Sequence, residues 1–443
     1  MIALSPDQER ALARLHAFSR DQSEHTLALS GPAGSGKSTL IGRFLRETDR
    51  MVQLSATTNK AAAVAAALAG EPTGQTIHKL LGLRPVRDYR NGTNKLRPSG
   101  QSKVGMGELV LIDEASMVDR TLYTCLLECA EENALQLLFV GDPYQLPPVD
   151  DGDQPMVFET TETLMLETVH RQAEQSPVLA LATRFRAVLD GADYPVIRPH
   201  GEALQRFELK AFGARVRELF SSKDYSDDPD HCRLLAYTNA RVHQLNTYVR
   251  QFLLGADAKR YAFLPGERLI ANEPLIESGE VRLSNNTAIV VQRTEQSRFK
   301  DAGFEIPGWQ LEIAEAGAGD PLSVFVADDQ ALARQYLASL KQQALRAKQQ
   351  GSDSATRAAW QRYFRATEQF ADLRPPYAST VHKSQGSTYQ HVLIHLEDIA
   401  RTVDQPNGLL ARLLYVSITR AVQSAGFFGR LPQHLYAHGR IAA

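Results

Sequence analysis

Short apolar runs alternate with helical patterns along the first third of the chain. The run at 26–30 is followed by a glycine-rich loop and a helix that begins near Ser38, and an alanine-rich helix is predicted at 59–69. Strands that alternate with helices are typical of a parallel sheet with helices on both faces, so we predict an α/β fold. The predicted strands of this first series are 26–30, 51–56, 108–112 and 135–140.

A turn-rich segment, 84–103, interrupts this series. It contains Asn91-Gly92 between extended residues, and it carries six basic residues against one acidic residue. Asn-Gly in that setting favours a tight hairpin turn. We therefore predict a basic hairpin that projects from the sheet, with an irregular surface loop as the alternative.

A second strand–helix series begins with a strand at 233–238 and a helix at 240–254. The following residues, 265–326, are β-rich and rich in turns, which favours a small barrel, and 328–373 are helical and basic. The simplest account is a second α/β domain that carries a β-plus-helix insertion. The series resumes with a strand at 391–396, a helix that ends near Arg420, and a strand at 426–428.

Length and composition limit the function only loosely. The 443 residues allow two to four domains, and a formal net charge of −2 means that any nucleic-acid site must be a local basic surface. Cys125, Cys129 and Cys232 lack the paired spacing of a zinc site and are interpreted as buried apolar side chains of a reduced, intracellular protein. No apolar run approaches the about 20 residues of a membrane span, and no secretion signal is evident. We expect a soluble cytoplasmic protein without a membrane partner.

The loop after the first strand has the spacing of a phosphate-binding loop. The segment 31–39, Gly-Pro-Ala-Gly-Ser-Gly-Lys-Ser-Thr, matches G-x-x-x-x-G-K-[ST] between a strand and a helix, which is the required context. Its glycines allow consecutive N–H groups to face phosphates, and the helix N-terminus adds its positive end. We predict that Lys37 reaches the β- and γ-phosphates of ATP and that Ser38 binds Mg²⁺. The predicted nucleotide-binding residues are Gly34, Ser35, Gly36, Lys37, Ser38 and Thr39.

The third strand delivers two adjacent carboxylates, Asp113 and Glu114, at the end where ligands bind in such sheets. Asp113 suits the Mg²⁺ shell, and Glu114 suits the base that activates the attacking water. The plain alternative is that they cap the next helix. Gln145, after the fourth strand, can bond both a γ-phosphate and a water molecule, so it is predicted to sense hydrolysis.

Two arginines and one glutamine complete the candidates for this site. Negative charge accumulates on the γ-phosphoryl oxygens in the transition state, so a cleft between two lobes needs cations from its far side. Arg171 and Arg420 lie in or near the second α/β series, although most arginines are simply solvated. Gln8 is either an adenine contact or part of a capping box that starts at Ser5, and the residues alone leave both open.

Taken in order, these segments resemble the superfamily 1 helicases, and specifically the RecD-like branch 1B, over nearly the whole chain. The resemblance implies that Arg171 and Arg420 are arginine fingers, that Gln8 contacts adenine and that Gly386 lies at the nucleotide. The segments that carry it are Gln8, 31–39, 55–62, 76–81, 113–116, 141–148, 169–172, 379–388 and 414–421.

The resemblance also implies an architecture and an activity. Two RecA-like lobes would close and open around Mg²⁺–ATP, and the chain would move 5′ to 3′ on single-stranded DNA as a helicase at single-strand–duplex junctions. A monomer is expected, with a single-strand-binding protein as a partner that it could contact. The implied domains are 1A (1–83 and 106–170), a strand-separating pin 1B (84–105), 2A (171–260 and 375–443), and 2B (261–374), an SH3-like barrel with basic helices.

Polar side chains at the ends of predicted strands suit a DNA path, because hydroxyl, amide and imidazole groups hold phosphates and sugars without reading sequence. Each could instead be a helix cap, Thr57 and Thr380 especially. Tyr89 is the lone aromatic residue of the predicted pin and would stack on bases only from its tip. The DNA candidates are Thr57, Thr58, Asn59, His78, Tyr89, Asn239, Thr380, His382 and Lys383.

Other interpretations fit less well. A small-molecule kinase would not need a second lobe with its own arginine, and a non-hydrolysing switch would lack Glu114 or the arginines. An RNA helicase of the upframeshift type would carry a Cys/His-rich zinc module, against which three scattered cysteines argue. Trp360, Tyr363 and Phe364 lie among the basic residues of the insertion, where we favour a core role over base stacking.

Overall fold

The computed structural model describes residues 4–70, 74–99, 102–148, 155–168, 176–277, 280–301, 303–315 and 321–436. The chain forms two compact units. Unit 1 comprises Met1–Leu83, Pro98–Leu245 and Tyr377–Ala443, and unit 2 comprises Arg84–Arg97 and Asn246–Pro376.

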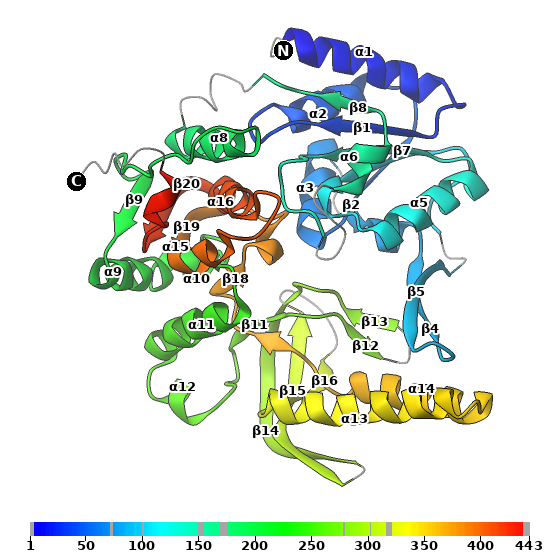
Figure 1. Cartoon of the computed structure of the whole chain (residues 1–443), viewed down its shortest axis with the longest axis vertical. Coiled ribbons are helices and arrows are strands. Elements are labelled where there is room, and N and C mark those ends of the chain that lie inside the picture. Colours follow the sequence, from blue (N-terminus) through cyan, green and yellow to red (C-terminus); the bar gives the residue numbers. More distant parts are fainter. Residues whose placement is uncertain are drawn as a thin grey trace. The chain divides into compact units, whose positions relative to one another are not determined.

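The first sheet of unit 1 has six strands in the order β3-β2-β6-β7-β1-β8, and its neighbouring strands run parallel. Figure 1 labels β1, β2, β7 and β8 of this sheet. Helices α1 and α2 pack on this sheet through apolar side chains such as Phe18 and Phe44. The strands are β1 (Thr26–Ser30), β2 (Val52–Ala56), β3 (Gln75–Thr76), β6 (Leu109–Asp113), β7 (Gln136–Gly141) and β8 (Thr163–Met165). The helices are α1 (Pro6–Arg20), α2 (Lys37–Glu47), α3 (Asn59–Ala69), α4 (Ile77–Leu80), α5 (Arg120–Asn133) and α6 (Met156–Thr160).

The second sheet of unit 1 has five parallel strands in the order β18-β10-β19-β20-β9. Its core includes Phe185 and Leu414, and also Leu146 from the loop that follows β7 of the first sheet. The strands are β9 (Leu204–Phe207), β10 (Cys232–Ala236), β18 (Ala378–Thr380), β19 (Tyr389–His395) and β20 (Ala421–Phe428). The helices are α8 (Pro177–Leu189), α9 (Leu209–Phe220), α10 (Lys223–Asp227), α15 (Leu396–Ile399), α16 (Leu409–Thr419) and α11 (Asn239–Leu254), which continues into unit 2.

Unit 2 is built on an antiparallel sheet of five strands in the order β16-β15-β14-β11-β17. Helices α13 (Gln330–Gln349) and α14 (Asp353–Thr367) lie side by side in the same unit (Figure 1). The sheet strands are β11 (Arg268–Ala271), β14 (Ala288–Asp301), β15 (Phe304–Glu315), β16 (Leu322–Ala327) and β17 (Leu373–Arg374). The remaining elements are the short helix α12 (Asp257–Arg260) and two hairpins, β12 (Leu275–Glu277) with β13 (Glu280–Leu283), and β4 (Leu83–Asp88) with β5 (Thr93–Pro98).

The predicted parallel α/β arrangement, the β-rich insertion and the basic hairpin are therefore present. The hairpin residues group with unit 2, whereas the expected domain scheme placed them in an insertion of the first lobe. Closure of the five-stranded sheet as an SH3-like barrel and the role of the hairpin as a pin stay predictions. All three cysteines are buried, as predicted. In the described ranges no helix is both long and apolar enough to cross a membrane.

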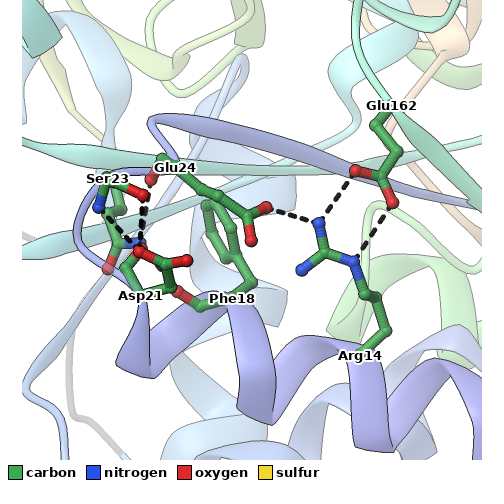
Figure 2. Close-up of polar contacts among 7 residues, drawn as sticks. Arg14, Phe18, Asp21, Ser23, Glu24 and Glu162 are labelled. Atoms are coloured by element: carbon green, nitrogen blue, oxygen red, sulfur yellow. Dashed lines mark hydrogen bonds and ion pairs between the residues drawn. The ribbon is translucent and has the colours of Figure 1, made fainter.

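Helix α1 is fixed to the first sheet by polar contacts as well as by its core. Figure 2 shows the Arg14 guanidinium between the carboxylates of Glu24 and Glu162, with 2.8 Å from Nη2 to Glu162 Oε2. The amide of Gln136, at the start of β7, donates to the carbonyl oxygens of Phe18, Asp21 and Glu24 at 2.8–3.0 Å. These contacts hold the C-terminal half of α1, and Gln8 of its first turn donates to the Ser35 carbonyl oxygen of the glycine-rich loop at 3.0 Å.

Candidate nucleotide-binding site

The loop between β1 and α2 has the backbone geometry that the sequence predicts. Gly34 and Gly36 have φ of 83° and 79°, a region that non-glycine residues rarely adopt. A Cβ on Gly31 would lie 2.6 Å from Ser35 Oγ and 3.0 Å from Leu166 Cβ, so only glycine fits there. The Lys37 ammonium group donates to the carbonyl oxygens of Gly31 and Pro32. It therefore points back toward the loop, while Ser38 and Thr39 follow it in the first turn of α2, which begins at Lys37.

Asp113 and Glu114 lie at the carboxyl end of β6, two strands from the loop. Burial, together with the neighbouring Glu114 carboxylate, raises the pKa of Asp113 from 3.8 to about 6, and the Lys37 ammonium opposes this shift. Glu114 has a left-handed backbone with φ of 53° and ψ of 42°, which is strained for a residue with a side chain. Strain of this kind often marks a functional position.

The donor set fits Mg²⁺, which is usually held by one or two protein oxygens together with phosphates and water. Ser38 and Asp113 would supply those protein oxygens. Within the described residues, no group of three or more His, Cys, Asp or Glu side chains forms a complete metal cage.

Gln8 is buried, and its side chain takes part both in the capping box of α1 and in a contact with the glycine-rich loop. Its side-chain oxygen accepts a hydrogen bond from the Ser5 amide at 3.1 Å, so the capping box is present. Its amide nitrogen donates to the Ser35 carbonyl oxygen at 3.0 Å. Gln8 therefore connects the first turn of α1 to the glycine-rich loop, and its contact with adenine stays a prediction.

Unit 1 has two lobes, the first sheet with its helices and the second sheet with its helices, and side chains of the second lobe hold the segment 141–148 of the first. The hydroxyl of Tyr415, on α16, accepts a hydrogen bond from the Ala33 amide of the glycine-rich loop at 3.0 Å and donates to the carboxylate of Asp142. Both Tyr415 and Asp142 are buried. Burial of Tyr415, together with the neighbouring Asp142 carboxylate, keeps the pKa of that hydroxyl well above its usual range, so it stays protonated and can donate.

Two further side chains of the second lobe hold the same segment by its backbone. Arg412 Nη1 donates to the carbonyl oxygens of Pro143 and Gln145 at 2.8 and 3.0 Å. Gln385 Nε2 donates to the carbonyl oxygen of Leu146 at 2.9 Å. The Gln145 side-chain oxygen is buried and has no hydrogen-bond partner among the residues that the structure describes, which is unusual for a buried amide and consistent with a site for a ligand or water.

Arg420 lies at the end of α16 and is buried. Its guanidinium donates to the carbonyl oxygens of Val416 and Ser387 and to the Thr419 hydroxyl, at 3.2–3.3 Å. In the part of the chain that the structure describes, it forms no ion pair with a carboxylate. A buried cation without a counter-ion is costly, and an anionic ligand would compensate it. Arg171, the other predicted finger, lies outside the described residues.

Gly386 brings the second lobe against the first. It has φ of 69°, and a Cβ at this position would lie 3.0 Å from Thr58 Oγ1 and 3.8 Å from Glu114 Cγ. Thr57 Oγ1 donates to the Glu114 carbonyl oxygen at 3.5 Å. The predicted nucleotide residue Gly386 and the predicted DNA residues Thr57 and Thr58 therefore meet beside the predicted base.

The remaining DNA candidates differ in their hydrogen bonds, their protonation and their exposure. Thr58 caps α3 by accepting from the Ala61 amide at 3.2 Å, so the cap interpretation holds for this hydroxyl. Thr380 accepts from the Lys383 amide at 3.3 Å, but the N-cap residue of the short helical turn His382–Ser384 is Val381. Burial lowers the pKa values of His78 and His382, so both rings are neutral at physiological pH. Asn59 and Asn239 are exposed.

Tyr89 lies in the turn between β4 and β5, but its ring packs against Phe364 of α14, with ring centroids 5.8 Å apart. Trp360 and Phe364 are buried, which confirms the predicted core role. Sequence reasoning missed the roles of Asp142, Arg412, Tyr415 and Gln385. The available signal was the three-residue spacing of Arg412 and Tyr415, which places both on one side of a helix.

Two family models and several known proteins match this chain. Residues 3–188 match the family model described as an AAA domain, and residues 375–426 match the UvrD-like helicase C-terminal domain. The chain is 24% identical over 432 residues to the ATP-dependent DNA helicase dda of Enterobacteria phage T4, covering 90% of this chain and 93% of that protein. It is 34% identical over 160 residues to the ATP-dependent RecD2 DNA helicase of Deinococcus radiodurans, covering 35% of this chain and 21% of that protein. It is also 34% identical over 165 residues to the ATP-dependent DNA helicase Pif1 of Bdellovibrio bacteriovorus, covering 34% and 35% of the two chains.

Proposed function

Because the chain belongs to the RecD-like helicases of superfamily 1B, we propose that it is an ATP-driven DNA helicase that moves 5′ to 3′ on single-stranded DNA and unwinds duplexes. One observation carries the proposal. The Tyr415 hydroxyl of a second parallel-sheet lobe accepts a hydrogen bond from Ala33 in the glycine-rich loop of the first lobe, at 3.0 Å and within a single compact unit. A nucleotide bound to the loop would therefore touch groups from both lobes.

In this proposal, Lys37 and the loop amides bind the ATP phosphates, and Ser38 and Asp113 hold Mg²⁺, which neutralises part of the phosphate charge. Glu114 orients the attacking water and takes its proton. Arg420 and Arg171 stabilise the charge that develops on the γ-phosphoryl oxygens, and Gln145 senses its loss. Hydrolysis then lets the two lobes of unit 1 separate, and ATP binding brings them together.

The DNA contacts follow from the same lobes. Thr57, Thr58, Asn59 and His78 of the first lobe would alternate their grip with Thr380, His382 and Lys383 of the second, while Asn239 adds a contact after β10. The boundaries proposed for the domains are those expected above, with 84–105 as the strand-separating pin and 261–374 as an SH3-like barrel plus basic helices. We propose a monomer as the working form, and a single-strand-binding protein as a further partner.

The first experiment is Lys37→Ala, compared with Lys210→Ala on the exposed side of α9 as a matched loss of one lysine. We expect Lys37→Ala to abolish DNA-stimulated ATP hydrolysis and to leave binding of a dT oligonucleotide largely intact, because Lys37 contacts nucleotide phosphates and not DNA. Phosphate release and fluorescence anisotropy measure the two activities. Turnover at the wild-type rate in Lys37→Ala would sink the proposed function.

The second experiment tests substrate and direction. ATP hydrolysis is compared with poly(dT) and poly(U) as activators, and unwinding is compared on duplexes with a 5′ or a 3′ single-stranded tail. We expect stimulation by poly(dT) and unwinding of the 5′-tailed duplex. Preference for poly(U) would favour an RNA helicase, and preference for the 3′ tail would reverse the proposed polarity.

A further inference from the structure

The hairpin β4–β5 is docked on the helices of unit 2. Arg87 is ion-paired with Glu368, and its guanidinium lies over the ring of Phe364 at 5.2 Å from the centroid. Lys348 of α13 donates to the Asn91 side-chain oxygen at 2.9 Å. The turn is therefore held on α13 and α14 by polar and aromatic contacts, which gives the surface beside it a defined shape.

A groove runs between this hairpin and α14. It consists of two adjoining cavities of about 470 and 670 Å³, which share Val86, Arg87, Tyr89 and Gln361 as lining residues. The groove lies entirely within unit 2. Its lining combines an aromatic ring and an apolar side chain with several guanidinium groups, and it is open to solvent along its length.

The charge of the groove comes from arginines on both walls. Arg90 and Arg97 belong to the hairpin wall, and Arg357 and Arg365 belong to α14, where they stand eight residues apart with Gln361 midway, and so lie on one helix face. All four arginines are exposed. Within the described residues, none of the four forms an ion pair with a carboxylate.

The acidic groups of the groove do not offset this charge. The Glu368 carboxylate forms an ion pair with Arg87, and both side chains are largely buried. Asp88 accepts hydrogen bonds from the amides of Arg90 and Asn91, at 3.0 and 3.2 Å, so its carboxylate stabilises the hairpin turn. Five arginines against two carboxylates leave a net charge of about +3 on the lining, in a chain whose total is −2.

We propose that this groove binds a single strand of DNA by its phosphates, and that the strand is the one displaced at a fork. Guanidinium groups recognise phosphates with paired N–H donors, and repeated phosphates suit arginines spread over two walls. A basic groove with an aromatic ring is the usual form of a sequence-independent single-strand site. The proposal rests on the proposed helicase function, in which the loops of unit 1 already hold the other strand.

The test uses the full chain without ATP. The variant Arg357→Gln/Arg365→Gln removes both charges of the α14 wall, and Arg90→Gln/Arg97→Gln removes those of the hairpin wall. The matched control is Arg334→Gln/Arg346→Gln, two exposed arginines of the neighbouring α13 that do not line the groove. Trp309 and Trp360, the two tryptophans of the chain, both lie in unit 2, so their emission checks that this unit stays folded.

Binding is measured by fluorescence anisotropy on a duplex with a 5′ tail, a duplex with a 3′ tail, and a fork with both tails. We expect the wild type and the α13 control to bind the fork more tightly than either single-tailed duplex. Each groove variant should lose about tenfold in affinity for the fork. The slope of log affinity against log salt should fall by about 1.4 for two lost single-strand phosphate contacts.

Three outcomes overturn the assignment. The groove variants could bind the fork with the same affinity and salt slope as the α13 control. The second tail could give the wild type no added affinity. Polyglutamate could compete for the groove where a dT oligonucleotide does not, which would make it a site for an acidic peptide. None of these measurements depends on hydrolysis, so they remain distinct from failure of the proposed function, which the Lys37→Ala experiment decides.

Discussion

Removal of one buried hydroxyl group should uncouple the two lobes of unit 1. Tyr415→Phe keeps the ring, which packs in the core of the second sheet, and removes the oxygen that joins Ala33 to Asp142. Asp142 keeps its bond from the Tyr144 amide at 3.0 Å, so the loop itself is not dismantled. The variant therefore tests the connection between the glycine-rich loop, the segment 141–148 and α16.

The magnitude follows from the two lost bonds. A hydrogen bond from a neutral amide contributes about 0.5–1.5 kcal/mol, and one to a charged group about 1.5–3 kcal/mol. Loss of both should weaken the contact between the two lobes by about 2–4 kcal/mol, or a factor of about 30 to 1,000 in its equilibrium constant. Because the phosphate-binding loop is one of the two partners, the loss should appear in nucleotide use as well as in stability.

The assay measures kcat and KM for ATP with saturating dT oligonucleotide, together with urea unfolding followed by far-ultraviolet circular dichroism. We expect a fall of tenfold or more in kcat/KM and a reduced urea midpoint. Tyr436→Phe is the control, since Tyr436 also packs on the second core. A double-mutant cycle with Asp142→Asn should give a coupling energy above about 1 kcal/mol. A coupling of zero would refute the reasoning, whatever the single variants do.

Three smaller predictions concern single side chains. The pKa of Asp113 is about 6 in the folded protein against 3.8 for a free side chain, so without Mg²⁺ or nucleotide the free energy of unfolding falls as pH rises from about 4 to 6. Asp113→Asn should therefore raise the free energy of unfolding at pH 7 by up to about 3 kcal/mol while abolishing ATP hydrolysis. An unchanged urea midpoint would contradict this. Gly92→Ala should destabilise unit 2 by more than the about 1–2 kcal/mol of backbone strain, because at φ of 70° its Cβ would lie 2.2 Å from the Trp360 ring. The control for strain alone is Gly351→Ala, at φ of 76° with open space around it, and both variants are followed by tryptophan-monitored unfolding. Equal losses of stability in the two variants would exclude the clash with Trp360. Thr58→Ala should lower stability by about 1 kcal/mol in thermal unfolding, because the Thr58 hydroxyl caps α3. Thr58→Ser keeps a hydroxyl and should retain the stability of the wild type. If serine does not, the cap does not explain the loss.

Local pattern was enough to predict the elements of the first sheet. Strand β1 and helix α3 occupy the predicted residues, because a run of apolar residues and a run of alanines each determine their own structure. Short edge strands were missed. Strands β8 and β18 have three residues each, too few to show a period, and they form only because a longer neighbour offers its backbone.

The site shows the same distinction between features of one contiguous segment and contacts between residues far apart in the chain. The glycine-rich loop and the carboxylates at the end of β6 were predicted because each is a contiguous segment with its own spacing. The Tyr415 contacts could not be predicted, since its two hydrogen bonds join residues 382 and 273 positions apart. Tyr89 shows the opposite limit. Its place in the turn was evident, but only the fold reveals that its ring faces Phe364.

Helix α16 gives the proposed motor its simplest physical basis. One face of this rigid element carries Arg412 and Tyr415, which hold the segment 141–148 and the glycine-rich loop, and its end carries the buried guanidinium of Arg420. In the proposed function, a charge change at the γ-phosphate would act on Arg420 directly. Because the helix is rigid, a shift at its end displaces the groups that grip the first lobe about one to two turns earlier. The same helix would thus sense the nucleotide and hold the lobes together, so we expect Arg420→Ala and Tyr415→Phe to be non-additive in kcat.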